Sequence, residues 1–405
     1  MVTVIRGGRV FVGTNAEPIA DGVVAVEQGK ITYAGPSSGF VQPKGEVNLI
    51  DAGGRTVLPG LVDLHVHMII HYKRPVEHHL ERAIGATLMN GVANCDRALR
   101  SGITTVRDCG AGHLGIFALR DSINSGEVKG PRIFAAGKAI CMTGGSSWEA
   151  LCREADGPDE CRKAAREQLR RPGTIFVSAD GADHLKVMAT DQGYSRTRVQ
   201  MTVEEMAAVA EEAHKMERRV AAHVGGAAGA MNCVKAGIDS IEHGNVLDEA
   251  SIEAMRKAGT SYVPTLAVYW EPAVRGTAGG FTQHEVGYCK IYYGPHKRSF
   301  EMALEAGIRI GAGTDSGSLT HVLGKSLHQE LQLLVEYGMT PASALRAATS
   351  VAAEILGQES RLGSLEVGKL ADVLIVDGNP LADIGDIRNT WLVMRDGQVV
   401  VDNRK

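Results

Sequence analysis

Eight short apolar runs, each followed by a helix-like segment, occupy the middle of this chain. An apolar run of this length between turn signals is typical of a strand that is buried on both faces. Eight such strands with their helices, over about 300 residues, predict an α/β fold of the (β/α)8 TIM-barrel type. An open doubly wound sheet is the structural alternative, but no glycine-rich phosphate loop follows the first strand. The expected strands are LVDLHVH (61–67), GITTVRD (102–108), RIFAAG (132–137), HLKVMA (184–189), RRVAAH (218–223), GIDSIEH (237–243), TSYVPT (260–265) and GIRIGAGTD (307–315).

The segment TVEEMAAVAEEAHKMERR illustrates the helices between these runs. Thr202 and Glu205 have the spacing of a capping box, which predicts the start of a helix. Helical spacing predicts one apolar face, made of Met206, Val209, Ala213 and Met216.

The two ends of the chain differ from the middle. Residues 1–57 contain short β-rich runs separated by Gly, Asn and Asp turn signals, and residues 358–405 repeat this pattern in KLADVLIVDGN and TWLVMRDGQVVVDN. We therefore predict one small β-sandwich domain built from both termini, with the barrel spanning residues 58–357.

The stretch TVLPGLVDLHVHM places titratable side chains on a strand that looks buried. Side chains alternate along a strand, so Asp63, His65 and His67 point to the same face. Taken alone, the stretch fits satisfied core histidines and a metal site about equally well.

Other expected strands also end in titratable residues, and active sites of such barrels lie at the C-terminal ends of the strands. Each of these residues has an ordinary explanation by itself, such as a helix cap or a lysine that reaches the surface. Their common position favours a metal site, and imidazole and carboxylate suit zinc and its divalent neighbours. The candidate ligands are His65, His67, Lys186, His223, His243 and Asp315.

Composition restricts the class of partner. The seven cysteines are scattered without a C-x-x-C pair, which fits reduced thiols in a cytoplasmic protein and excludes a thiolate zinc site. A net charge of -4 lacks the excess of positive charge that binding to nucleic acid or to an anionic membrane requires. The sequence MVTVIRGGRV lacks the apolar core of a signal peptide, and no apolar stretch approaches a membrane span. We expect a small-molecule substrate and a homo-oligomer.

These motifs together resemble the amidohydrolase superfamily over nearly the whole chain. HVH after the first strand, HLK on the fourth, single histidines on the fifth and sixth and GTD on the eighth carry the resemblance. Within the superfamily, HLKVMAT, AAHVGGAAG and DSIEHG look like the prolidase-like branch, which hydrolyses N-acyl amino acids.

The resemblance implies a binuclear centre in which the fourth-strand lysine carries a CO2-derived carbamate. In this chain Lys186 would bridge two divalent ions, expected to be zinc. His65, His67 and Asp315 would hold one ion, and His223 and His243 the other. A bridging hydroxide would attack the amide carbonyl, while Asp315 takes its proton and passes it to the leaving nitrogen.

The chain departs from the relatives' pattern in the loops that shape the pocket. Relatives usually show GGHGH after the third strand, where the first histidine polarises the carbonyl, whereas this chain has GGSSW and places Ser146 there. After the fourth strand, this chain has MATDQGY where the relatives have MATGG. His113 is the first candidate to replace the missing histidine. Arg153, Arg196 or Arg198 is a candidate clamp for a substrate carboxylate, although we expect Arg198 to be solvated. The candidate pocket residues are Ser146, Trp148, Arg153, Tyr194, Tyr269 and His113, whereas His71, His78 and His79 are not expected to be ligands.

The leading function is hydrolysis of an amide-type C–N bond in a dipeptide, N-acyl amino acid or related amide. The nearest alternative is a cyclic amide, urea, carbamate or xenobiotic aryl amide, which the altered GGSSW loop favours. Deaminases of the superfamily that this chain resembles normally keep one metal and place a glutamate shortly after the fifth-strand histidine. Here VGGAAG follows His223 and contains no glutamate, so a mononuclear heterocycle deaminase is disfavoured. A non-catalytic scaffold is disfavoured because all six candidate ligands are present.

Overall fold

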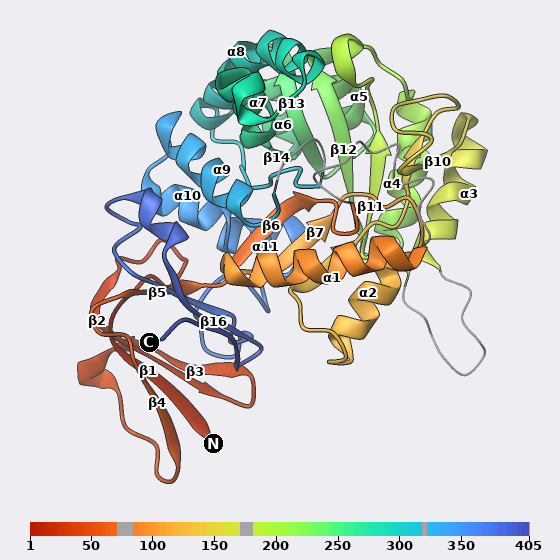
Figure 1. Cartoon of the computed structure of the whole chain (residues 1–405). Helices are drawn as coiled ribbons and strands as arrows, with labels where there is room; N and C mark the ends of the chain where they lie inside the picture. Colours follow the sequence, from red (N-terminus) through yellow and green to blue (C-terminus); the bar gives the residue numbers. More distant parts are fainter. Residues whose placement is uncertain (71–83, 171–180, 318–321, 405) are drawn as a thin grey trace, which may run out of the picture.

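The computed structural model describes residues 1–70, 84–170, 181–317 and 322–404. It consists of a sheet built from both ends of the chain and a larger body of alternating strands and helices (Figure 1). His71, His78 and His79 lie outside the described residues.

The larger body is a barrel of parallel strands. β6 pairs with β7 and β7 with β8, while β9, β11, β12, β13 and β14 form a second parallel run, with β10 beside β9. The two runs meet where Asp183, just before β11, donates its backbone N–H to the carbonyl of Ala135 in β8 (2.9 Å). The strands are β6 (Leu61–Val66), β7 (Ile103–Asp108), β8 (Arg132–Ala135), β9 (Ala139–Cys141), β10 (Cys152–Glu154), β11 (His184–Met188), β12 (Arg219–Gly226), β13 (Ser240–Val246) and β14 (Ser261–Val263).

Residues 309–316 close the barrel between β14 and β6. On one side Gly311 donates its N–H to the carbonyl of Tyr262 (2.9 Å), and on the other Leu64 donates to Ala312 (3.0 Å) and His67 to Ser316 (2.8 Å). This segment is the predicted eighth strand, although it is too irregular to form a continuous ladder. The barrel is thereby confirmed, and the open doubly wound sheet is excluded.

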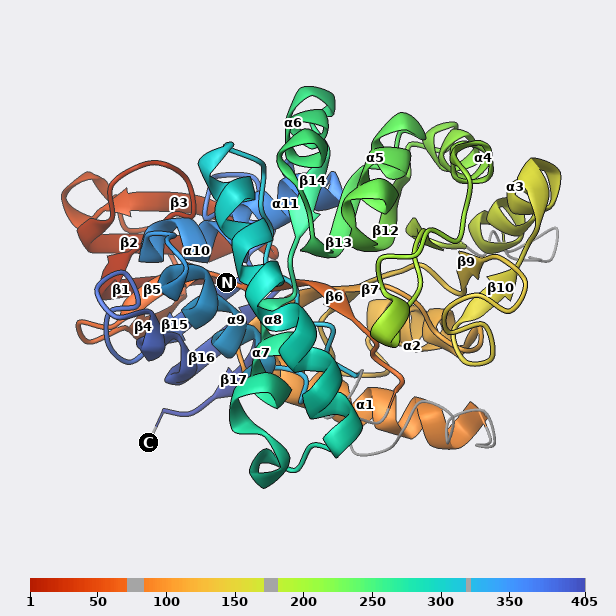
Figure 2. The same cartoon turned by 90° about the horizontal axis from the view of Figure 1, so that it is seen from above.

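Helices surround the strands, as the view from above shows (Figure 2). The capping box of α4 is confirmed: Thr202 accepts from the N–H of Glu205, whose carboxylate accepts from the N–H of Thr202. Met206, Val209 and Ala213 are buried as predicted, but Met216 is 38% exposed because the helix ends before it, so its placement on the apolar face was wrong. The helices are α1 (Ile84–Arg100), α2 (Gly115–Asn124), α3 (Gly157–Leu169), α4 (Val203–His214), α5 (Ala227–Lys235), α6 (Glu249–Ala258), α7 (Leu266–Arg275), α8 (Gln283–Glu305), α9 (Lys325–Glu336), α10 (Pro341–Ala347) and α11 (Ser350–Leu356).

The two ends of the chain share one sheet of order β17-β16-β15-β5-β1-β2-β3, and β4 also pairs with β1. β5 links the two ends directly, because it pairs with both β1 and β15. One buried apolar cluster includes Ile31 of β3 and Ile375 of β15, so the sheet curves around it. The strands are β1 (Val2–Val10), β2 (Ile19–Glu27), β3 (Lys30–Pro36), β4 (Val47–Asp51), β5 (Thr56–Pro59), β15 (Val373–Val376), β16 (Thr390–Arg395) and β17 (Gln398–Asp402).

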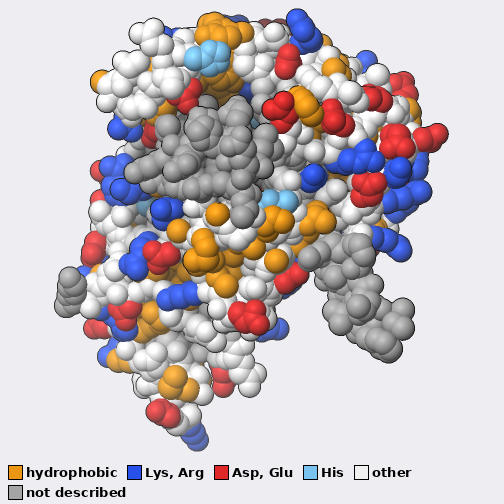
Figure 3. Space-filling view, turned by 45° about the vertical axis from the view of Figure 1, so that its right-hand side comes forward, with side chains coloured by type: hydrophobic (Ala, Val, Ile, Leu, Met, Phe, Trp, Pro, Cys, Tyr) orange, Lys and Arg blue, Asp and Glu red, His pale blue; other side chains and the backbone are white. Residues whose placement is uncertain are grey.

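The outer surface is mixed in character. Exposed apolar side chains include Ile84 and Met89 of α1 and Leu114 just before α2. Figure 3 shows apolar side chains gathered in the middle of one face. Among the helices of the described ranges, none combines the length and apolarity that crossing a bilayer requires.

Candidate metal centre and substrate pocket

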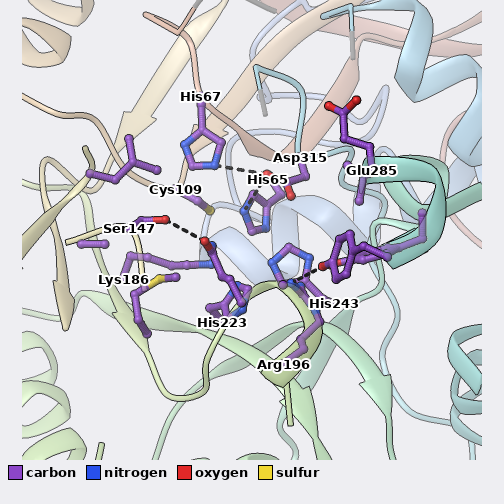
Figure 4. Close-up of a pocket in the computed structure, with 18 of the residues that line it drawn as sticks. His65, His67, Cys109, Ser147, Lys186, Arg196, His223, His243, Glu285 and Asp315 are labelled. Carbon is purple, nitrogen blue, oxygen red and sulfur yellow. Dashed lines mark hydrogen bonds and ion pairs between the residues drawn. The ribbon is translucent and has the colours of Figure 1, made fainter. Parts of the chain in front are cut away.

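A cavity of about 340 Å³ lies at the C-terminal ends of the barrel strands. It brings together side chains from β6, β11, β12 and β13 and from the segment that closes the barrel (Figure 4). All six residues predicted as metal ligands line it: His65, His67, Lys186, His223, His243 and Asp315.

His65, His67 and Asp315 form one group at the cavity wall. Asp315 Oδ1 lies 3.2 Å from Nε2 of His67 and 3.7 Å from Nε2 of His65. Their candidate ligand atoms all lie within 4.8 Å of one another. Nδ1 of His67 lies 2.8 Å from the carbonyl oxygen of Gly110, to which it donates when Nε2 is the free nitrogen. A second-sphere acceptor of this kind fixes the ring and leaves Nε2 available to a metal.

A buried ion-pair network holds His65 from the opposite side. Nδ1 of His65 lies 2.8 Å from Oε2 of Glu242, which is completely buried on β13. Oε1 of Glu242 accepts from Arg107 Nη2 at 2.7 Å and from the hydroxyl of Ser240 at 2.7 Å. Arg107 also donates to the carbonyl of Leu64 (2.6 Å). The network therefore crosses the barrel interior from β7 to β13 and ends on a candidate ligand.

The charges of this network favour a neutral imidazole beside a carboxylate anion. Burial lowers the pKa of His65 to about 4, and the nearby charge of Lys186 acts in the same direction. Burial alone would raise the pKa of Glu242, but Arg107 and His65 outweigh it and hold that pKa well below its usual range. A neutral ring is the form that binds a metal.

Cys109 lies close enough to His65 and Glu242 to form a second possible ligand group. Burial raises the pKa of its thiol to about 12, whereas a metal ligand must be a thiolate. Glu242 is already engaged by Arg107. We therefore assign Glu242 to the positioning of His65.

Replacing Glu242 with glutamine tests this assignment. Glutamine cannot accept from both Arg107 and the ring N–H of His65 as a carboxylate does, so the ring loses its orientation. We expect the dissociation constant for zinc to rise about 10- to 100-fold, measured by competition with a chromophoric chelator. Glu253→Gln, at an exposed pair with Arg256, is the matched control. Unchanged zinc affinity in Glu242→Gln would contradict the assignment.

His223 and His243 form the second group. Their ring centroids are 4.7 Å apart, and the ring of His243 lies 5.0 Å from that of His65. Nδ1 of His243 lies 2.8 Å from the hydroxyl of Thr265, and Nε2 of His223 lies 3.3 Å from the carbonyl oxygen of Asp191. Burial and the charge of Arg196 lower the pKa of both histidines well below the ordinary value, so both are neutral.

Lys186 enters the cavity from β11 with its ammonium group unpaired. The residue is 2% exposed, and Nζ has no hydrogen-bond partner within the described residues. An unpaired buried ammonium is costly, and divalent ions beside it would increase the cost. Conversion to a carbamate would replace the cation by anionic oxygen ligands. The orphaned nitrogen and the imidazoles around it therefore fit a lysine that is carboxylated and bridges two metals.

The backbone is strained at the site. His243 and Asp315 have φ values of 67° and 57°, and Thr265, which contacts His243, has 53°. Non-glycine residues in this left-handed region cost about 1–3 kcal/mol each and persist where the surroundings enforce them. The backbone conformation that directs these side chains into the cavity is therefore held at a cost in folding free energy.

Of the six predicted pocket residues, only Tyr269 lines the cavity, where it is 2% exposed. Ser146 does not line the cavity, and its hydroxyl donates to Oδ1 of Asp191 (3.1 Å). Its neighbour Ser147 lines the cavity instead and donates to the side chain of Gln192 (2.9 Å). The GGSSW loop does reach the pocket, but one residue later than the sequence indicated.

The other four candidates lie outside the cavity lining. Arg153 is paired with Glu160 and Glu167, so a role as carboxylate clamp is not supported. Nε2 of His113 lies 2.6 Å from the hydroxyl of Thr87, and its Nδ1 accepts from the N–H of Gly115 (3.0 Å), so both ring nitrogens have local partners. The side chains of Trp148 and Tyr194 are about half exposed, at 46% and 53%.

Arg196 and Tyr288 also line the cavity, although neither lies at the end of a barrel strand. Arg196, one of the three candidate arginines, lies in the loop after β11 and is 3% exposed. Tyr288 reaches the cavity from α8, and its hydroxyl accepts from Nη1 of Arg196 (2.8 Å). No sequence signal indicated Tyr288, because α8 is an addition after the seventh strand whose packing is set by tertiary contacts.

Comparison with known proteins gives a consistent result. Residues 56–400 match the model of the amidohydrolase family. The ochratoxinase of Aspergillus niger is 31% identical over an alignment that covers 95% of this chain and 82% of the relative. Among solved structures, a Xaa-Pro dipeptidase with bound methionine is 31% identical with a TM-score of 0.86, covering 98% of this chain and 99% of the other. A prolidase in complex with N-methylphosphonate-L-proline is 28% identical with a TM-score of 0.88, covering 99% of this chain and 100% of the other.

Proposed function

Because the chain belongs to the amidohydrolase family, we propose that it is a metal-dependent hydrolase that cleaves an amide C–N bond with two divalent ions. The observation that carries the two-ion proposal is the buried Nζ of Lys186, which has no hydrogen-bond partner among the described residues and lines the same cavity as both histidine groups. Relatives named for hydrolysis of dipeptides and of ochratoxin support an amide that carries an amino acid as the substrate class.

The six candidate ligands divide into two groups that would each hold one ion and a lysine that would lie between the ions. His65, His67 and Asp315 would hold one ion, His223 and His243 the other, with carboxylated Lys186 between them. Such ions polarise a carbonyl and lower the pKa of bound water towards neutrality.

Asp315 has the position and charge of a proton acceptor. Burial would raise the pKa of its carboxyl, but the hydrogen bond with His67 acts in the opposite direction, and the pKa lies well below the usual range. The carboxylate is therefore ionised at neutral pH. We assign it the transfer of a proton from the attacking water to the departing amine nitrogen.

Metal analysis tests the two-ion proposal directly. Protein purified without chelator and loaded with zinc is expected to contain close to two ions per chain by mass spectrometry of the acid-digested sample. A reproducible value of one would favour the mononuclear layout of a deaminase. Removal of the ions by a chelator should abolish hydrolysis of a panel of dipeptides, N-acyl amino acids and aryl amides, and re-addition should restore it.

A further inference from the structure

The side chain of Arg196 is a buried cation in the wall of the proposed active-site cavity. Nε donates to Oδ1 of Asn245, and Nη1 donates to the hydroxyl of Tyr288 at 2.8 Å. The guanidinium carbon lies 4.9 Å from the ring centroid of Tyr269. Nη2 is buried and has no hydrogen-bond partner within the described residues. The guanidinium is therefore fixed on three sides, with one nitrogen unused.

The end of β12 is shaped to admit this side chain. A Cβ atom on Gly225 would lie 2.3 Å from Cγ of Arg196 and 2.2 Å from its carbonyl oxygen. A Cβ atom on Gly226 would lie 2.9 Å from Cβ of Thr197. Only glycines let the loop after β11 approach the strand so closely, which places Arg196 beside the second histidine pair.

The charge of Arg196 has no carboxylate partner in the described part of the chain. Its polar neighbours are the amide of Asn245 and the phenols of Tyr269 and Tyr288. Among carboxylates, Asp315 acts on it, because its negative charge raises the pKa of Arg196. Asp315 itself is hydrogen-bonded to His67 across the cavity. A buried cation without an ion-pair partner is costly, so a ligand anion would gain more here than at a solvated arginine.

We propose that Arg196 is the specificity-determining residue of this site and binds a single carboxylate on the amide substrate. Nη2 supplies a charge-assisted hydrogen bond, and the hydroxyl of Tyr288 has its own proton to donate to the second oxygen. The inference rests on the proposed function, because it assigns the carboxylate to the molecule whose amide bond is cleaved. Val268 and Met188, which also line the cavity, favour an apolar group next to that carboxylate.

The test compares two amine ligands that differ only in the carboxylate. L-phenylalanine and L-phenylalaninol are titrated into zinc-loaded protein by calorimetry. Wild-type protein should bind the acid more tightly than the alcohol. In Arg196→Gln the affinity for the acid should fall about 10- to 100-fold, as expected for a lost hydrogen bond to a charged group, and the affinity for the alcohol should stay unchanged.

Matched variants separate this role from simple charge and folding effects. Arg198→Gln removes an exposed arginine from the same loop and should leave both affinities unchanged. Arg196→Lys keeps the charge but loses the planar fork, so it should retain only part of the preference for the acid, and it decides the question if Arg196→Gln does not fold. Equal binding of acid and alcohol by the wild type, or an undiminished preference in both Arg196 variants, would overturn the inference.

Turnover distinguishes this inference from the proposed function. N-acetyl-L-phenylalanine and N-acetyl-L-phenylalaninamide are compared by kcat/KM, and Arg196→Gln should lower the ratio of acid to amide, mainly through KM. Hydrolysis of both compounds at equal kcat/KM by the wild type would overturn the carboxylate site and leave amide hydrolysis intact. Absence of hydrolysis across the wider amide panel would count against the proposed function, whereas the calorimetry would still decide the role of Arg196.

Discussion

Replacing Lys186 with alanine is expected to lower kcat by about 10³-fold or more, because the lost bridge removes several kcal/mol of transition-state stabilisation by the ions. The ammonium nitrogen is buried without a hydrogen-bond partner among the described residues, so the bare side chain contributes no hydrogen bond to the fold. Alanine should therefore leave the barrel folded, as judged by circular dichroism, while zinc content falls below two ions per chain.

Short carboxylic acids provide the control for this prediction. Acetate or formate can enter the space left by the side chain and supply the missing oxygen ligands, so added acid should restore part of the activity and the zinc content of Lys186→Ala. Lys235→Ala, which removes an exposed lysine from α5, should retain full activity. An alanine variant at position 186 that holds two ions and turns over normally would refute the bridging role.

The barrel and its candidate ligands were predictable because both follow from local patterns. A parallel strand buried on both faces appears in the sequence as a short apolar run, and its C-terminal residue lies at the functional edge of the barrel. That rule located His65, His223 and Asp315 although they are far apart in the chain. The eighth strand was found in the same way, even though residues 309–316 join their neighbours by only a few backbone bonds.

The pocket wall was less predictable because loop direction is not a periodic property. Ser146 and Ser147 are adjacent, yet of the two only Ser147, whose φ is positive (56°), lines the cavity. Arg153 and Arg196 both lie in or beside a loop, and they differ in the residues that surround them. Glutamates on a neighbouring helix pair with Arg153, whereas two glycines admit Arg196 to the interior.

The support behind the ligands was also invisible in the sequence. Arg107 and Glu242 lie on β7 and β13, which are not adjacent strands, and they meet only because the barrel closes. An arginine or glutamate within an apolar strand indicates a buried ion pair, but it does not identify the partner. Such a pair orients His65 from within the barrel, while the loops above it determine which substrate would reach the proposed metal centre.

Replacing Asp315 with asparagine is expected to lower kcat by about 10²-fold or more, because a proton acceptor is lost. Asparagine is the appropriate replacement, since it keeps the shape and tolerates the left-handed backbone at this position (φ 57°). The backbone N–H of residue 315 donates to the carbonyl of His65 at 2.7 Å, and this bond does not depend on the side chain. The fold should therefore survive, and Asp96→Asn, on the exposed surface of α1, is the control.

The readout has to separate the loss of a ligand from the loss of a base. Asp315 lies 3.2 Å from Nε2 of His67 and belongs to the group that would hold the first ion, so the asparagine variant is assayed at saturating zinc with its zinc content measured in parallel. Full occupancy with a collapsed kcat would assign the proton transfer to Asp315, since the ions alone would not sustain the reaction. Full occupancy with near-normal kcat would make Asp315 a ligand only and would place the proton acceptor elsewhere in the cavity.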